Sequence, residues 1–248
     1  MSHSLSFNEI DLSTYGLRVK NANIPDFAQE NESQLIQDIS YSFPPKRPPK
    51  IFQVPVIVSA ADRATLDGYL DSIKSVIVTE VACKLAFDSI TSRYWMAKQE
   101  DLSGDYHGPN LWIGNVIFRA DDPTAYAASE TDSNYSIDAD PKTVIETAGG
   151  TTMASPVYTL AAGENLTDVT ILVENLNTGE ELSWEGSLAN GEELEIDSKA
   201  WTVKKEGTED MSSISGQFPR LQPGANSIKV TGFSNTGSLN IKYRARYL

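Results

Sequence analysis

The chain has 248 residues and carries 20 Lys and Arg against 34 Asp and Glu, which gives a net charge of −14. An acidic chain without a dense basic cluster does not suit binding to duplex phosphates, so the composition excludes the duplex-binding class. Hydrophobic residues at 40% and charged residues at 22% are ordinary for a soluble globular protein, and the length predicts two domains.

The sequence shows neither a targeting signal nor the cysteines needed for disulfides or cysteine-rich metal sites. No run of about 18 apolar residues occurs, and the N-terminal MSHSLSFNEI lacks the basic and apolar regions of a secretory signal. We therefore expect assembly in a cytoplasm. Cys83 is the single cysteine, which excludes disulfides within the chain and cysteine-rich metal sites, and its apolar neighbours predict a buried side chain.

The first part of the chain predicts short strands. Residues 5–20 fit one or two strands, and residues 35–43 and 51–58 fit two more, with a polar loop over 21–34. Pro55 lies inside the last of these strands and predicts an edge position or a bulge.

A change of period then predicts the one helix, over residues 59–78. Apolar residues fall there at spacings of three and four, with Ser59 as N-cap and Asp62 favoured by the helix dipole. Three further strands are expected after it, over 81–87, 92–98 and 110–120.

The second half predicts an all-β domain. Short strands recur there about every ten residues, as in a β-sandwich or jelly roll; they cover 157–163, 168–175, 180–186, 192–197, 200–207, 226–232 and 238–247. The predicted fold is mainly β, with a sandwich or split-barrel-like domain containing one helix over 1–130, a linker over 131–155 and a sandwich over 156–248.

No catalytic, cofactor or metal site is assigned. The two histidines, His3 and His107, lie at the terminus and in a turn, and no zincin, nucleophile-elbow or Walker motif is present. Asp121 and Asp122 can contribute to a calcium site, but Asp-Asp-Pro is first a turn signal.

A second possible role for clustered carboxylates is a glycosidase catalytic pair, because four acidic residues lie close together in sequence. Such a pair is defined by distance across a cleft, so the solvated face of a hairpin is the favoured interpretation. The residues are Glu192, Glu193, Glu195 and Asp197. In that hairpin Leu194 and Ile196 are expected to face inward, opposite Trp201 and Val203.

The four tryptophans are the candidates for sugar stacking. Trp95, Trp112 and Trp201 have apolar strand-like surroundings, which predict core packing. Trp184 has the more polar neighbourhood SWEG and is left open as a sugar contact.

Two turn segments are the most distinctive. The stretch 216–230, GQFPRLQPGANSIKV, places two prolines and two glycines before an alternating strand. The stretch 118–126, FRADDPTAY, holds a second turn at Asp122 and Pro123, followed by Tyr126.

These two stretches resemble the distal tail proteins of long-tailed bacteriophages, the siphovirus-type tail component family. Three further stretches carry the same resemblance: 7–19, FNEIDLSTYGLRV; 194–207, LEIDSKAWTVKKEG; and the terminal YRARYL. The resemblance implies a galectin-like second domain in which the 216–230 turn shapes the fold. Phe218 and Leu221, on either side of Pro219, would anchor the core. Pro223 and Gly224 would then set the turn, and the Asn226 side chain would bind the turn's backbone.

The resemblance implies a structural hub rather than an enzyme. Such proteins form a hexameric ring through the first domain, stack on the tail tube, hold the tail-tip or tail-associated protein, and can support receptor-binding proteins. The expected location is the tail tip of a phage or prophage virion, where DNA passes through the ring without specific binding.

Two departures from the family limit the resemblance. The chain has Glu9 where the family often has a Phe-Asn-Gly turn, and its short second half leaves little room for long receptor-gripping arms. Two other classes stay open: a carbohydrate-binding module using the second sandwich on host cell-wall sugars, and a cell-wall hydrolase, which the lack of motifs disfavours.

Overall fold

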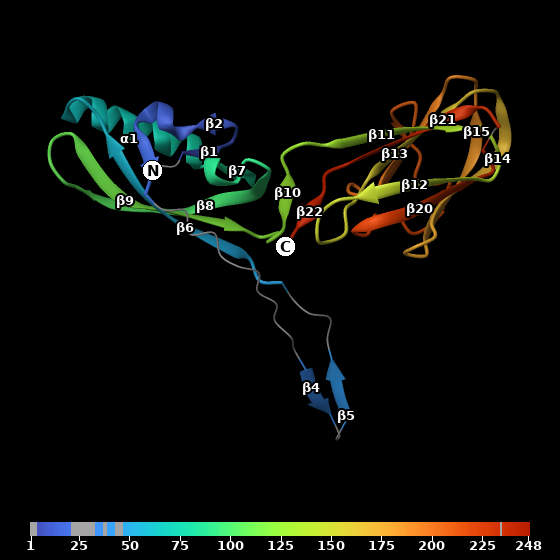
Figure 1. The fold of residues 1–248 in the computed structure, drawn as a ribbon, viewed down its shortest axis with the longest axis horizontal. Coiled ribbons are helices and arrows are strands. Elements are labelled where there is room, and N and C mark those ends of the chain that lie inside the picture. The colour runs from blue at the N-terminus through green and yellow to red at the C-terminus, as the bar shows by residue number, and fades with distance from the viewer. Residues whose placement is uncertain (1–3, 21–32, 37–38, 43–46, 234) are drawn as a thin grey trace. The chain divides into compact units, whose positions relative to one another are not determined.

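The computed structural model describes residues 4–20, 33–36, 39–42, 47–233 and 235–248. The chain separates into two compact units, one formed by Met1–Ala128 with Leu248 and the other by Ser129–Tyr247 (Figure 1). The expected fold class, mainly β with one helix, is confirmed.

The first unit is built around one antiparallel sheet with strand order β2-β1-β7-β8-β9-β6-β3 and β10 added at β8. Its elements are β1 Leu5–Phe7, β2 Ile10–Asp11, the 3-10 helix η1 Leu12–Tyr15, β3 Leu17–Val19, β6 Lys50–Ser59, α1 Arg63–Ile77, β7 Cys83–Phe87, the 3-10 helix η2 Asp88–Ile90, β8 Arg93–Tyr106, β9 Leu111–Ala120 and β10 Ala125–Ala127.

The two arms of this sheet face each other across an aromatic core. The long strand β8 pairs with β7 through its first residues and with β9 through the rest, with a bulge between Gln99 and Asp101. Phe7 of β1 and Phe118 of β9 stack with ring centroids 5.1 Å apart, and Phe52 of β6 meets Trp95 of β8 at the same distance. This arrangement gives the sandwich-like first unit that the sequence predicts.

The single helix begins later than expected. Its N-cap is Asp62, whose carboxylate accepts a hydrogen bond from Thr65 N at 2.8 Å, whereas Ser59 ends β6. The predicted N-cap at Ser59 is therefore wrong, because the strand runs on through that residue. The buried residues Leu66, Leu70, Ile73 and Ile77 form the apolar stripe, and α1 packs over β6 and η1 (Figure 1).

Pro55 is accommodated inside β6 without a bulge. The strand is interior, since β9 pairs along its whole length and β3 along Val56–Val58. Pro55 lies immediately past the end of the β3 pairing, where its carbonyl accepts from Lys20 N at 3.0 Å. Because Pro55 has no N–H, it cannot return this hydrogen bond, and the pairing with β3 ends there.

Strands β4 Ser33–Ile36 and β5 Ile39–Ser42 pair as an antiparallel hairpin, where the sequence predicts one strand over 35–43. Most of the predicted loop over 21–34 lies outside the described residues. The strands expected over 81–87, 92–98 and 110–120 are confirmed as β7, β8 and β9, with β8 extending eight residues past the prediction to Tyr106.

The second unit is a sandwich of two antiparallel sheets, with orders β11-β21-β13-β16-β17-β18 and β12-β20-β14-β15-β19. Its strands are β11 Thr131–Ile137, β12 Lys142–Ala148, β13 Val157–Ala162, β14 Leu166–Asn175, β15 Glu180–Leu188, β16 Glu193–Asp197, β17 Thr202–Lys205, β18 Thr208–Glu209, β19 Ile214–Gly216, β20 Gly224–Thr231, β21 Gly237–Tyr243 and β22 Arg246–Tyr247.

The linker expected over 131–155 is wrong. It contains β11 and β12, which pair with β21 and β20 as full members of the two sheets. The composition there is rich in small polar residues, but Ile137, Val144 and Ala148 still enter the core. A strand needs only its inward positions to be apolar, and small residues suffice where the partner sheet is close.

A buried carboxylate links the two sheets at one edge. Glu146 of β12 accepts hydrogen bonds from Tyr135 of β11 and Tyr243 of β21, both at 2.9 Å. Burial, followed by these hydrogen bonds, raises the pKa of both tyrosines to about 12, so they stay protonated donors. The polar contact keeps the two edge strands in register with the opposite sheet.

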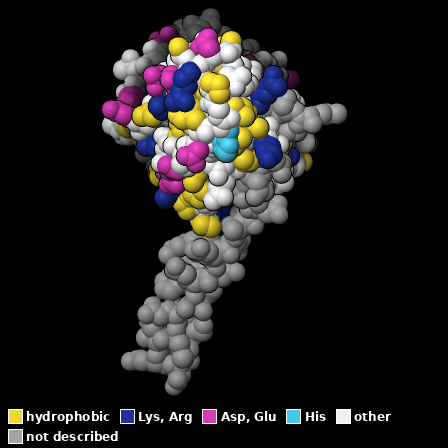
Figure 2. Space-filling view, turned by 90° about the vertical axis from the view of Figure 1, so that its left-hand side faces the viewer, with side chains coloured by type: hydrophobic (Ala, Val, Ile, Leu, Met, Phe, Trp, Pro, Cys, Tyr) yellow, Lys and Arg dark blue, Asp and Glu magenta, His cyan; other side chains and the backbone are white. Residues whose placement is uncertain are grey.

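On the face of the first unit in Figure 2, Lys and Arg side chains are interspersed with Asp, Glu and apolar side chains.

No helix among the described residues is long and apolar enough to span a membrane. The described residues also contain no group of three or more His, Cys, Asp and Glu side chains that could hold a metal ion.

Candidate functional site

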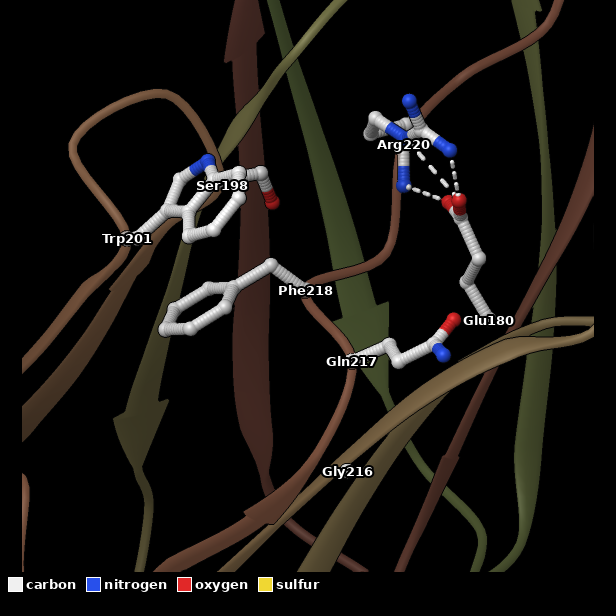
Figure 3. A pocket seen from close by; sticks show the side chains of 7 residues that line it. All are labelled: Glu180, Ser198, Trp201, Gly216, Gln217, Phe218 and Arg220. Atoms are coloured by element: carbon white, nitrogen blue, oxygen red, sulfur yellow. Dashed lines mark hydrogen bonds and ion pairs between the residues drawn. The ribbon is translucent and has the colours of Figure 1, made fainter. Parts of the chain in front are cut away.

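The second unit has a partly open pocket of about 430 Å³. It lies between the turn that joins β16 to β17 and the segment that follows β19. Figure 3 shows the Trp201 and Phe218 rings on one side, the Glu180–Arg220 pair on the other and Gln217 below. Its lining residues are Glu180, Ser198, Trp201, Gly216, Gln217, Phe218 and Arg220.

Trp201 stands on a turn that is held by its own backbone and by Asp197. The Asp197 carboxylate accepts from Lys199 N at 2.7 Å and Ala200 N at 2.9 Å, and the Asp197 carbonyl accepts from Trp201 N at 2.8 Å. Trp201 itself has φ +60°, the left-handed region that bulky residues rarely adopt. The result is an indole that projects outward with 70% of its surface exposed.

Ser198 joins this turn to the opposite wall of the pocket. Its hydroxyl donates to the Pro219 carbonyl at 2.8 Å, and its backbone N donates to the Pro156 carbonyl at 2.9 Å. The residue is buried. The Trp201 turn and the 217–220 segment are therefore held together as one rigid rim.

The 216–221 segment forms that second wall because both of its ends are paired. Gly216 pairs with Leu182 of β15, Gln217 N donates to the Glu181 carbonyl at 2.6 Å, and Leu221 exchanges backbone hydrogen bonds with Ala154. Leu221 is fully buried, whereas Phe218 is partly buried, packs against the core and also lines the pocket.

A buried amide stabilises the turn that follows. Asn226 Oδ1 accepts from Gln222 N at 2.9 Å, and its Nδ2 donates to the carbonyls of Gln222 and Gly224 at 2.8 and 2.9 Å. Asn175 Nδ2 donates to the same Oδ1 at 3.0 Å. Gly224 has φ +92°, which a side chain would strain, and Pro223 precedes it at the exposed tip.

The charged wall of the pocket is an ion pair with little net charge. Arg220 donates to Glu180 through its backbone N and through Nε, both at 2.8 Å, and also through Nη2. The Glu180 side chain is 11% exposed and the Arg220 side chain 48%. Burial raises the pKa of Glu180, but hydrogen bonds and charge from Arg220 outweigh that effect and hold this pKa below its ordinary value.

Trp184, left open as a possible sugar contact, is too deeply buried for that role. Trp184 of β15 is 1% exposed and fills the sandwich core, with Nε1 donating to the Asp210 carboxylate at 2.9 Å. Its ring lies over Gly186, where a Cβ would collide with the indole. Trp95 and Trp112 are buried, at 4% and 5% exposed, as predicted.

Trp201 is the reverse case, since it was wrongly expected in the core. The hairpin does pair Ile196 with Val203, both buried, but Trp201 precedes β17 and lies in the turn. Counting alternate positions back from Val203 assumes that the strand extends to residue 201. The Asp-Ser-Lys sequence at 197–199, which forms Asx-type turns, was the signal against that assumption.

Three of the four acidic hairpin residues are engaged in ion pairs or in the turn. Glu195 bonds Lys204 and Glu192 bonds Lys205, each at 3.0 Å, while Asp197 is engaged in the turn. Glu193 is exposed. Glu192, Glu195 and Asp197 therefore have local structural roles, while Glu193 lies on the solvated face, as predicted.

The second turn segment is held by Asp122. Its Oδ1 accepts from Thr124 N at 3.1 Å and from the Thr124 hydroxyl, and its Oδ2 accepts from Tyr126 OH at 2.8 Å. Asp121 binds Arg119 instead. Pro123 sits between these contacts, so the stretch is a side-chain-stabilised turn leading into β10.

The remaining candidates are the two histidines and the single cysteine. His107 is exposed in the turn between β8 and β9, with its backbone N donating to the Leu111 carbonyl. Cys83 is buried, as predicted. His3 lies outside the described residues.

One comparison with known proteins concerns the second unit. Residues 149–247 match the family model described as "Siphovirus-type tail component, C-terminal domain". The second unit carries a siphovirus-type tail component domain. The match includes the hairpin at 194–207 and the turn segment at 216–230, so the predicted family resemblance is confirmed on two of its landmarks.

Solved structures extend the likeness from this domain to the whole fold. The SPP1 Dit (gp 19.1) protein is 15% identical, with a TM-score of 0.79 over 99% of each chain. A chain of the phage P2 baseplate in its activated conformation with Ca is 10% identical, with a TM-score of 0.53 over 97% of each chain; the form with Sr gives the same values. At these identities the likeness shows the fold. No curated protein matches the chain.

Proposed function

We propose that this protein is a structural distal tail protein, the baseplate hub of a long-tailed bacteriophage or prophage. The observation that carries the proposal is the tail component domain at 149–247 within a chain whose whole fold follows SPP1 Dit. That protein is described as a paradigm of hub adsorption apparatus in phages infecting Gram-positive bacteria, and the second relative belongs to a baseplate.

In this proposal the first unit forms a hexameric ring that stacks on the tail tube. The opposite side of the ring holds the tail-tip or tail-associated protein, and the second unit supports receptor-binding proteins. The function requires rigid protein surfaces rather than a reaction, which fits side chains engaged in turns, ion pairs and core contacts. The site of action is the tail tip of the virion.

The net charge of −14 supports passage of DNA through such a ring. A negative lumen repels phosphates, so the genome slides instead of binding. Replacing the carboxylates that line the channel with lysine should slow DNA ejection. Ejection at an unchanged rate would contradict this part of the proposal.

Solution mass tests the ring directly. Light scattering of the full chain over a range of concentrations should give six or twelve times the chain mass of 27.1 kDa, and negative-stain images should show a central channel. A particle that keeps the mass of one chain at every concentration, with no rings in the images, would contradict the hexamer.

A further inference from the structure

We propose that the pocket between Trp201 and Arg220 binds a neutral saccharide, with the sugar ring stacked on the Trp201 indole. This inference is independent of the hub function. It rests on an exposed aromatic residue in a strained conformation, on a rigid rim around it and on polar side chains that face the same pocket (Figure 3).

The exposed indole is the first step. The sandwich has a core without Trp201, which lies outside the buried cluster formed by the two sheets. A left-handed conformation costs an L-residue roughly 1–2 kcal/mol, and full exposure of a large aromatic ring adds a hydration cost. Conformations of this kind cluster at ligand-binding sites, because the surrounding structure imposes them.

Preorganisation is the second step. The Asp197 and Ser198 hydrogen bonds fix the turn that presents Trp201, and Ser198 fixes it to the Pro219 carbonyl of the other wall. A ligand that enters therefore meets a formed surface and loses little affinity to ordering of the protein.

The polar groups are the third step. Within the described residues, Arg220 Nη1 has no hydrogen-bond partner, while Nε and Nη2 bind Glu180. In the same part of the chain the Gln217 side-chain amide is also without a partner, and it offers both a donor and an acceptor to the pocket. Hydroxyl groups, which donate and accept, match this set.

Charge decides among ligand classes. The two charged residues of the lining, Glu180 and Arg220, neutralise each other. An anion would have to compete with Glu180 for Arg220, and residues 131–248 carry 9 basic against 17 acidic residues, a net charge of −8 that repels nucleic acid. A purely apolar ligand would leave Gln217 and Arg220 without partners.

Size fits the same class. A volume of about 430 Å³ is within the range of small-molecule pockets and admits a mono- or disaccharide. The aliphatic C–H face of the ring would lie on the negative face of the indole, and Phe218 would contact its edge. The equatorial hydroxyls would then reach Gln217 and Arg220.

A glycan array carrying neutral and acidic glycans tests the proposed saccharide binding. The full chain is then titrated, with tryptophan fluorescence as the readout, with each neutral glycan that binds on the array. Glucose, galactose and N-acetylglucosamine are titrated at millimolar concentrations whatever the array shows. We expect binding of at least one neutral glycan, with a blue shift of tryptophan emission. Trp201→Ala should weaken that binding at least about ten-fold and abolish the shift.

The matched control is Ile145→Ala, which removes an apolar side chain that is 66% exposed in the same unit but does not line the pocket. It should bind as the unaltered protein does. Gln217→Ala should weaken binding without changing the indole emission of the free protein. The inference is overturned if the unaltered protein binds no neutral glycan in either assay, if only acidic glycans bind, or if Trp201→Ala and Ile145→Ala bind equally well.

Discussion

Two tryptophan environments in the second unit have opposite outcomes. Trp184 lies within a strand and is 1% exposed, whereas Trp201 lies in a turn and is 70% exposed. Their sequence neighbourhoods predict the reverse, because SWEG is polar and AWTV is apolar. The difference shows that the position within a strand or turn decides burial, and that the polarity of the adjacent residues does not.

Each environment has its own means of support. Trp184 is fixed by close packing on Gly186 and by its bond to Asp210, so its contacts belong to the core. Trp201 is positioned by its turn, which is held by hydrogen bonds of Asp197 and Ser198. Mutation of Trp184 should therefore lower the stability of the fold, whereas mutation of Trp201 should affect binding at the surface.

Trp184→Ala should have the largest effect on stability. Removing a fully buried indole leaves a cavity between the sheets and leaves Asp210 without its donor, which should cost about 3–5 kcal/mol. Urea unfolding followed by circular dichroism measures the change. A loss below about 1 kcal/mol would show that the two tryptophan environments do not differ as described.

Asn226→Ala should come next, since it tests the buried amide behind the pocket. The change leaves Gln222 N and Asn175 Nδ2 without their acceptor and should cost about 1–3 kcal/mol. Gln222→Ala is the control, because Gln222 contributes only backbone groups to this turn, and its effect should stay within about 0.5 kcal/mol. Equal losses in both variants would contradict the role of Asn226.

Glu180→Gln tests the charged wall of the pocket at a smaller scale. The glutamine keeps the side-chain shape but loses the ion pair with Arg220. Because Arg220 is half exposed and water screens the pair, the cost at pH 7 should be about 1–2 kcal/mol.

The pH dependence of that difference has a defined sign. The pKa of Glu180 in the folded protein lies below its ordinary value of 4.5, so the stabilisation is present above pH 4.5 and is lost as the pH falls through the folded pKa. Unfolding curves of Glu180→Gln and of the unaltered protein should therefore converge in acid. A gap that persists at pH 2 would show that the effect does not come from ionised Glu180.

Trp201 should have the smallest effect on stability. Trp201→Ala should change the free energy of unfolding by no more than about 0.5 kcal/mol, because the indole is outside the core. Trp201→Gly should be more stable than Trp201→Ala by about 1 kcal/mol, since glycine adopts φ +60° without strain. Differential scanning calorimetry compares the three proteins. A loss as large as that of Trp184→Ala would place Trp201 in the core and remove the basis of the saccharide site.

The sequence by itself predicted most of the secondary-structure elements and a family resemblance. Alternation of apolar residues predicted most strands, a spacing of three and four predicted the helix, and the turn residues of 216–230 carried a resemblance that the domain match supports. These features follow from local periodicity and backbone preference, which neighbouring residues encode.

Only the tertiary structure decided that residues 131–155 contain two sheet strands, which tryptophan is buried and which polar groups meet. Glu180 and Arg220 are 40 residues apart, and Asn175 and Asn226 are 51 apart, so strand pairing alone brings them together. The exposure of Trp201 depends on one left-handed residue in a turn. Local patterns do not encode such contacts, because the register of distant strands and a single backbone angle set them.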